Sequence, residues 1–261
     1  MAAETRAGLL EDFRAIYADA LALAGGQDAL WPAPYSEDSP DGLIAFLTEC
    51  CWTLDEETSE ISQIPDLPHV RFFGDVWHLS RATGKTLLIE KSRRILVSWI
   101  LSACELWSMG LKQEGRVVSG LNYAKTSQQV WRTAWLYRQA RHRKFSKLRD
   151  CTPRGGSYTA QDVRSVILPN GSMIQGLNQE SDTFQGSGYA GIRLEELSHF
   201  DHVGAMLGQS YIITHGRADA IGGHVVGVCN AFPEQEWQEA KKIAKVVQNN
   251  DPTWLPEIPD A

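Results

Sequence analysis

The chain has 261 residues, of which 43% are hydrophobic and 22% are charged, an ordinary composition for a globular protein. A chain of this length can form one large α/β domain, alone or with a small appendage. No apolar run approaches the roughly 20 residues that a membrane-spanning helix needs, and the N-terminus lacks the basic-then-apolar order of a signal peptide. The five cysteines are scattered and form no CxxC pair, which favours reduced thiols in a cytosol over a disulfide framework or a zinc site.

Charge is distributed unevenly along the chain. Residues 1–68 carry 2 basic and 14 acidic side chains, residues 69–154 carry 17 and 5, and residues 155–261 carry 6 and 13. The basic middle third predicts a surface for a polyanion, whether nucleotide phosphate, nucleic acid or both. The alternative is that the acidic N-terminal part packs over the basic part.

The predicted elements begin with helices and then alternate between strands and helices. We expect an amphipathic helix over residues 3–24, a second helix over 43–54, and a linker with two prolines over 62–70. Asn170-Gly171 predicts a hairpin turn. The alternation predicts a largely parallel sheet, with functional loops at the carboxyl ends of its strands. The expected strands cover residues 86–90, 116–120, 163–168, 172–177, 189–194 and 224–229, and the expected helices cover 98–109, 126–147 and 203–213.

Two stretches are candidates for a phosphate-binding turn: Gly84-Lys85-Thr86 and residues 91–98. A phosphate-binding loop lies between a strand and the following helix, because the free N–H groups at the helix start point at the phosphate. Gly84-Lys85-Thr86 precedes its strand, so we expect an ordinary turn there. The second stretch has the required order, contains three cations, and places Ser98 where a P-loop hydroxyl would bind Mg²⁺. The alternative is a basic loop in which Ser98 only caps the helix.

Two later strand ends carry further groups that a P-loop ATPase needs. Such an enzyme requires one carboxylate near Mg²⁺ and a second to polarise the attacking water. Glu195 and Glu196 follow an apolar strand and can take these two positions. Asn230, at the end of the next strand, can sense the γ-phosphate, or it can be a simple turn former before Pro233.

Taken together, these motifs resemble the ATPase domain of large terminase subunits, the motors that package viral DNA into procapsids. Many members carry a deviant Walker A motif of the form K-[SA]-R-[RQ]-x-x-x-[ST]-W, and residues 91–99 (KSRRILVSW) fit it. The Walker B carboxylates of the family correspond to Glu195-Glu196, and its coupling motif corresponds to residues 229–231. Residues 182–191 are similar to the glycine-bearing run before Walker B. The resemblance spans roughly residues 63 to 240.

This resemblance implies an α/β fold of the ASCE-type P-loop NTPase class, with a mostly parallel sheet flanked by helices and a helical N-terminal subdomain. It implies ATP and Mg²⁺ as the bound cofactors. The phosphate contacts would come from Lys91, Ser92, Arg93, Arg94 and Ser98, and the metal ligands would be Ser98 and Glu195. Hydrolysis would depend on Glu196 as general base, on Arg93 and on Asn230. An arginine finger would be Arg93 in cis, or Arg132 or Arg138 in trans. Adenine would contact Gln63, Phe72, Phe73 or Trp77.

Three positions depart from the family pattern. Leu96 stands where the family usually has a glycine, and Val97 stands where a standard P-loop has its lysine. Phosphate charge must therefore be met by Lys91 or Arg93. Glu195 replaces the usual Asp, which places its carboxylate about one methylene further from the backbone.

The expected organisation is a helical N-terminal subdomain or lid over residues 1–65, an ATPase core over 66–245, and a linker over 246–261. The stretch of about thirty residues after Asn230 is too short for the nuclease domain that large terminases usually carry, so no nuclease activity is expected. The expected partners are double-stranded DNA, bound through phosphates at the basic run 138–149, a homo-oligomeric ring on a portal protein, and a small terminase subunit. No membrane is involved, and the expected location is the host cytoplasm, at the procapsid portal.

Two other functions remain open at this point. A catalytically degenerate P-loop-like scaffold would bind DNA or a portal without ATP turnover, and the three departures favour it. A helicase-type ATPase would require a second ATPase lobe and further helicase motifs, which this chain does not show.

Overall fold

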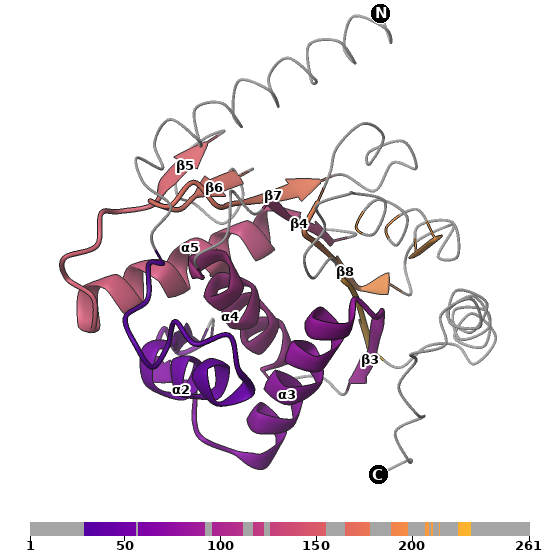
Figure 1. Ribbon diagram of the computed structural model, residues 1–261, viewed down its shortest axis with the longest axis horizontal. Helices are drawn as coiled ribbons and strands as arrows, with labels where there is room; N and C mark the ends of the chain where they lie inside the picture. The colour runs from indigo at the N-terminus through magenta and orange to yellow at the C-terminus, as the bar shows by residue number, and fades with distance from the viewer. Residues whose placement is uncertain are drawn as a thin grey trace, which may run out of the picture.

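The computed structural model describes residues 29–55, 57–91, 96–111, 117–122, 126–154, 165–177, 189–197, 207–208, 210, 214 and 224–230. The predicted helix 3–24, the predicted linker 246–261 and most of the predicted helix 203–213 lie outside these ranges. Within them the chain is a mixed α/β structure, with helices α2–α5 on one side of a sheet (Figure 1). No helix in this part of the chain is long and apolar enough to cross a membrane.

A seven-stranded sheet has the strand order β3-β9-β8-β4-β7-β6-β5. The strands from β3 to β7 in this order are parallel, and β6 and β5 are antiparallel additions at one edge. The predicted Asn-Gly hairpin joins β6 to β7, and its Gly171 has a left-handed φ of 82°. The mostly parallel sheet predicted from the sequence is therefore confirmed. The strands are β3 (Leu87–Lys91), β4 (Val117–Asn122), β5 (Thr152–Arg154), β6 (Ser165–Ile167), β7 (Met173–Leu177), β8 (Gly191–Glu195) and β9 (His224–Asn230).

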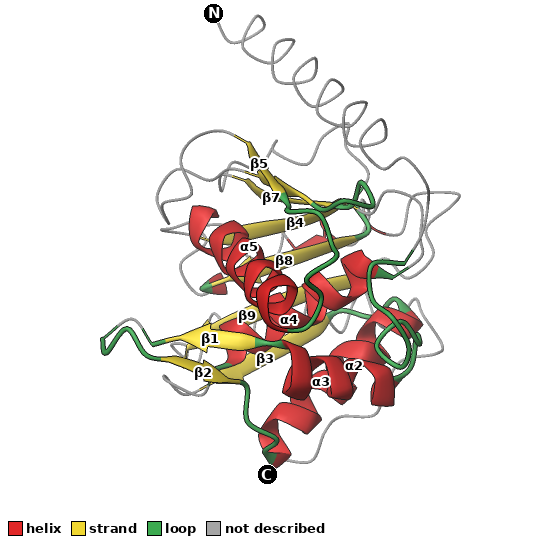
Figure 2. Cartoon of the chain, turned by 90° about the vertical axis from the view of Figure 1, so that its left-hand side faces the viewer, coloured by secondary structure: helices red, strands yellow, loops and turns green. Residues whose placement is uncertain are grey.

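Helix α4 lies at the centre of the helical layer (Figure 2). Nearly all of its side chains are buried, which agrees with a sequence that is apolar all round. Helices α3 and α5 pack against it, and α2 packs on α3. The helices are α2 (Pro40–Cys50), α3 (Pro68–Thr83), α4 (Val97–Gly110) and α5 (Thr126–Arg143), and a small hairpin is formed by β1 (Trp52–Leu54) and β2 (Ile61–Gln63).

The structure corrects the sequence prediction before residue 84. The helix expected over 43–54 ends at Cys50, and the chain continues as the β1–β2 hairpin. The segment 62–70 is not a linker, because Ile64 is buried at 1% exposure and α3 begins at Pro68. Proline fits this first helical position, since its missing N–H would have no partner within the helix there. Pro68 thus begins a helix and Pro65 lies shortly before it, so the two prolines do not mark a linker.

The N-terminal elements share one hydrophobic core with the helices that cover the sheet. Trp31 is buried, and its indole N–H donates to the carbonyl of Trp107 in α4 at 2.9 Å. An ion pair of 2.6 Å joins Asp38 to Arg81 of α3, and Arg81 is only 3% exposed. The acidic N-terminal part therefore packs on the basic middle part at this point, as the alternative explanation of the charge distribution requires.

Candidate active site

Gly84-Lys85-Thr86 is a turn that ends a helix, not one that begins a helix. Gly84 follows α3 in the left-handed conformation, with φ at 70°, and the N–H of Lys85 donates to the carbonyl of Ser80 at 2.9 Å. Strand β3 begins directly afterwards. The order is helix, turn, strand, so this turn does not lead into a helix. The expectation of an ordinary turn is confirmed.

The stretch 91–98 has the strand–turn–helix order that a phosphate-binding loop needs. Strand β3 ends at Lys91 and α4 begins at Val97. Leu96 occupies the N-cap position in the left-handed conformation, with φ at 60°, and its own side chain forms no capping hydrogen bond. Ser98 lies inside the first turn, and its hydroxyl donates to Glu195 Oε2 at 3.0 Å. The alternative in which Ser98 serves only as a cap is therefore wrong.

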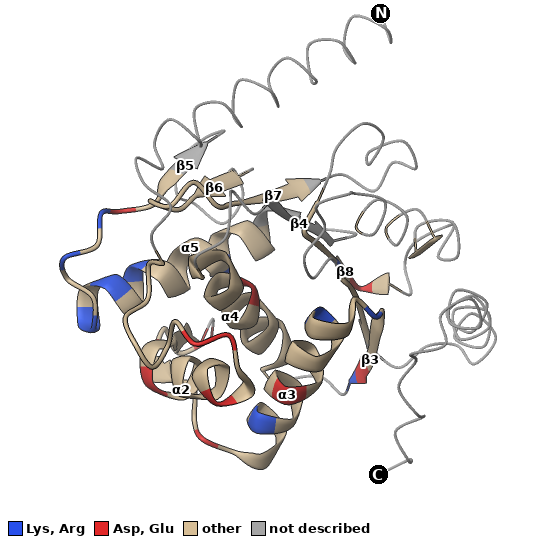
Figure 3. Cartoon of the chain, viewed as in Figure 1, with Lys and Arg blue, Asp and Glu red and all other residues tan. Residues whose placement is uncertain are grey.

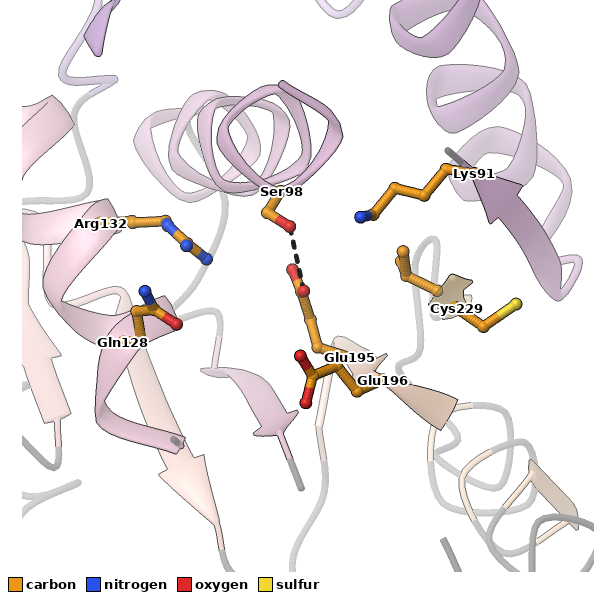
Figure 4. Close-up of a pocket in the computed structure, with 8 residues that line it drawn as sticks. Lys91, Ser98, Gln128, Arg132, Glu195, Glu196 and Cys229 are labelled. Atoms are coloured by element: carbon orange, nitrogen blue, oxygen red, sulfur yellow. Dashed lines mark hydrogen bonds between the residues drawn. The ribbon is translucent and has the colours of Figure 1, made fainter. Parts of the chain in front are cut away.

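Side chains from five neighbouring elements meet in one pocket beside this turn (Figure 4). Strands β3, β9 and β8 are adjacent and parallel, so their carboxyl ends lie at the same edge of the sheet. The lining residues are Lys91 from β3, Ser98 from α4, Gln128 and Arg132 from α5, Glu195 and Glu196 at the end of β8, and Val228 and Cys229 from β9.

The two acidic residues at the end of β8 differ in burial and in backbone conformation. Glu195 is 4% exposed and extends toward Ser98, whereas the carboxylate of Glu196 points away from that hydrogen bond (Figure 4). Glu196 has a left-handed φ of 56°. This conformation is uncommon for a residue other than Gly, Asn or Asp, and such strained residues cluster at functional sites. The turn thus gives two consecutive carboxylates different orientations at one pocket.

A buried ionic network shares Glu195 with the pocket. Arg193 of β8 is 1% exposed, and its Nε lies 3.2 Å from Glu105 Oε1 of α4. Its Nη1 lies 3.7 Å from Glu195 Oε1, and its Nη2 donates to the hydroxyl of Ser102 at 3.0 Å. Burial raises the pKa of Glu105 to about 7, against the effect of the nearby Arg193 guanidinium. The network connects the helix that carries Ser98 to the strand that carries Glu195.

This network was not predicted from the sequence, although its two central residues stand out in apolar segments. Arg193 is the one charged residue of residues 191–194 (GIRL), just before Glu195. Glu105 is the one charged residue of residues 102–107 (SACELW). A charged residue inside an apolar element is costly to bury unless it is paired. One basic and one acidic residue of this kind, on two elements that pack together, predict an internal ion pair.

The oxygen groups of Ser98 and Glu195 fit a magnesium ion. Mg²⁺ prefers oxygen ligands and usually keeps several waters beside one or two protein carboxylates and substrate phosphates. Glu195 Oε1 is a buried atom that accepts no hydrogen bond from the part of the chain that the structure describes. The described residues contain no group of three or more His, Cys, Asp and Glu side chains that could hold a metal. A metal ion bound by Ser98 and Glu195 would therefore have few ligands among the described residues.

Other predicted site residues lie elsewhere or outside the described ranges. Ser92, Arg93 and Arg94 fall in the gap at 92–95. Asn230 ends β9 beside Lys91 of β3, but its side chain lies outside what the structure describes.

The candidates for the adenine contact and for the arginine finger have different surroundings. Gln63 does not line the pocket, and its side-chain amide donates to the carbonyl of Thr48 at 2.6 Å. Trp77 is a fully buried core residue, whereas Phe72 is 46% exposed on α3. Arg138 pairs with Asp150 at the surface, at 3.1 Å. Arg132 lines the pocket of its own chain.

The comparisons with known proteins agree with this architecture. No family model and no curated protein matches the chain. Among solved structures, the chain is similar to the HK97 bacteriophage large terminase, with a TM-score of 0.55 and 15% sequence identity. The match covers 82% of this chain and 42% of that protein, so the chain spans less than half of its length. At this level of identity the likeness establishes the fold, which is the α/β fold predicted from the sequence.

Proposed function

We propose that this chain is the ATPase domain of a large terminase, which hydrolyses ATP to drive double-stranded viral DNA into a procapsid. The observation that carries the proposal is the 3.0 Å hydrogen bond between the Ser98 hydroxyl and Glu195. It joins the first turn of α4 to the carboxyl end of β8. In P-loop ATPases, a hydroxyl and a carboxylate at these two positions hold the Mg²⁺ of the bound nucleotide.

The remaining groups of the pocket can be given roles on the same basis. Lys91 supplies a cation at the end of β3 for the phosphates, and Glu196 accepts the proton of the attacking water. Arg193 holds the carboxylate of Glu195 against Ser98 through its contacts with both residues. The metal, when bound, neutralises charge that develops on the phosphates.

A basic surface at the end of α5 supports the proposed DNA partner. Arg141 and Arg143 end the helix, and further cations follow up to Arg149 (Figure 3). Such a surface would contact DNA phosphates independently of sequence and with strong salt dependence. The ring on a portal protein, the small terminase subunit and the setting in the host cytoplasm are parts of the same proposal.

A second candidate function is a scaffold that keeps the fold without ATP turnover. Two observations favour it. Leu96 adopts a left-handed conformation in which a glycine would carry no steric cost. Val97 is 2% exposed and packs in the core, so α4 provides no cation at the position of the usual P-loop lysine.

Two quantities, compared between the parent chain and three variants, separate the two functions. They are the affinity for Mg-ATP, measured by calorimetric titration, and the rate of ATP turnover. Lys91→Ala should weaken binding at least tenfold, because it removes a charged hydrogen bond to phosphate. Glu196→Gln should bind like the parent and lose at least about 100-fold in turnover, because only the general base is removed. The control is Arg71→Ala, which removes an exposed cation of α3 that pairs with Asp66 before the helix. It should change neither quantity.

Each result decides between the candidates. Binding that depends on Lys91, with turnover that depends on Glu196 and rises with double-stranded DNA, supports the motor. A parent chain that binds no Mg-ATP contradicts the motor and leaves the scaffold. Binding that is unchanged in Lys91→Ala means that the phosphate site lies elsewhere.

A further inference from the structure

We propose that Arg132 of α5 binds the phosphate groups of the nucleotide held by its own chain, opposite Lys91. This inference rests on the proposed function, since it assigns a further phosphate-binding residue to the same pocket. It differs from the expectation drawn from the sequence, in which Arg132 would reach the site of a neighbouring subunit.

Arg132 of α5 lines the same pocket as Lys91 of β3. Arg132 and Lys91 lie on opposite sides of the Ser98–Glu195 hydrogen bond, and the side chains of both point toward the space between them (Figure 4). Gln128 lines the same pocket one helical turn earlier on α5. Residues four apart share one face of a helix, so α5 presents a polar donor and a cation to the pocket together.

Aromatic contacts set the orientation of Arg132. Its guanidinium lies over the ring of Trp99, 5.7 Å from the ring centroid. Trp99 follows Ser98 in α4 and is itself 7% exposed, with Trp131 of α5 packed edge-on at 6.0 Å. A guanidinium stacked on a ring keeps its N–H groups in the plane, where they can form a forked contact with phosphate. The stacking thus orders the cation before a ligand binds.

The charges that line the pocket also favour a second cation at the phosphates. Its lining contains two carboxylates, Glu195 and Glu196, and two cations, Lys91 and Arg132. A triphosphate adds several negative charges, and the buried Val97 contributes nothing to balance them. Arg132 provides the second positive charge from another helix of the same chain.

The test is calorimetric titration of Mg-ATP into Arg132→Gln and Arg132→Lys, at a protein concentration at which the parent sediments as a monomer. Arg132→Gln should weaken binding about 10- to 100-fold, the range for charged hydrogen bonds. Arg132→Lys should fall between this variant and the parent, because it keeps the charge and loses the fork. Arg71→Gln, on the surface of α3, is the matched control and should bind like the parent.

Mixing two variants separates a contact within one chain from one between chains. If Arg132 acted between chains, adding Lys91→Ala, which retains Arg132, would restore turnover to Arg132→Gln. We expect no restoration, and restoration would overturn the inference. Affinity of Arg132→Gln equal to that of a parent that binds Mg-ATP would overturn it as well, and would leave the proposed function in place. A parent that binds no Mg-ATP would overturn both.

Discussion

Among single residues, two that lie in or close to the pocket in sequence have a left-handed backbone conformation. Leu96 precedes α4 with φ at 60°, and Glu196 follows β8 with φ at 56°. For an L-residue other than Gly this conformation costs roughly 1–2 kcal/mol. Ser59, in the β1–β2 turn, is the other non-glycine residue of this kind in the described ranges. Two of these costly positions therefore flank the site that we assign to nucleotide, where strain is commonly found.

Substitution of Leu96 tests whether this backbone strain is real. Leu96→Ala and Leu96→Gly both remove the side-chain packing, but only glycine removes the cost of the left-handed conformation. Glycine is also preferred over alanine at a helix N-cap. We expect Leu96→Gly to be more stable than Leu96→Ala by about 1 kcal/mol, in spite of the larger entropy of glycine in the unfolded chain. Urea denaturation of both variants measures the difference, and a more stable alanine variant would contradict the prediction.

At the scale of elements, α4 and β8 are held together by charged groups inside the protein. Arg193 of β8 contacts Glu105, Ser102 and the Ser98 carbonyl, all on α4. Each element could be predicted from its apolar sequence. The charged residues inside them could have been noted, but their partners depend on how the helix lies on the sheet. The connection explains how Glu195, with one more methylene than Asp, is held against Ser98.

The burial of Glu105 predicts how stability changes with pH. Burial raises the pKa of Glu105 from 4.5 to about 7, so between these values the native state binds more protons than the unfolded state. The contribution of Glu105 to stability is therefore fully present below its unfolded pKa and is lost as the pH rises toward 7. The loss should be on the order of 3 kcal/mol, since one pKa unit corresponds to about 1.4 kcal/mol.

The measurement is the free energy of unfolding of the parent and of Glu105→Gln in urea, from pH 5 to pH 8. Other groups titrate in both proteins, so the quantity of interest is the difference between the two proteins at each pH. The stability of the parent relative to Glu105→Gln should fall as the pH rises. A difference that does not vary with pH would show that Glu105 keeps an ordinary carboxyl pKa.

At the scale of the whole molecule, the described elements before residue 66 and those after it share one core. Phe46 of α2 is fully buried and packs against Trp31 at a ring separation of 4.7 Å, and Trp31 in turn bonds to α4. The same cluster of buried residues reaches β9. The domain boundary at residue 65 stays a prediction, but the described residues on its two sides belong to one continuous set of packed side chains.

Phe46→Ala tests whether the N-terminal elements unfold separately. Truncation of a buried phenylalanine costs about 3–5 kcal/mol. We expect one cooperative transition, shifted to lower denaturant, with the same midpoint by circular dichroism and by tryptophan fluorescence. The matched control is Phe72→Ala, which truncates a phenylalanine of α3 that is 46% exposed. Its free energy of unfolding should stay within about 0.5 kcal/mol of the parent's. An early transition of small amplitude, with the main one unmoved, would show an independent N-terminal unit.

The amino-acid pattern alone was enough to predict the described elements from β3 onward other than β5, the Asn-Gly hairpin, and the positions of the two candidate turns relative to β3 and α4. These are local properties, because periodicity, turn residues and strand–turn–helix order act over a few neighbouring positions. Three other facts could be found only from the folded structure: Arg132 lines the pocket of its own chain, Arg193 joins Glu105 to Glu195, and Pro68 begins a helix. These facts depend on contacts between residues far apart in the chain, which local pattern does not encode.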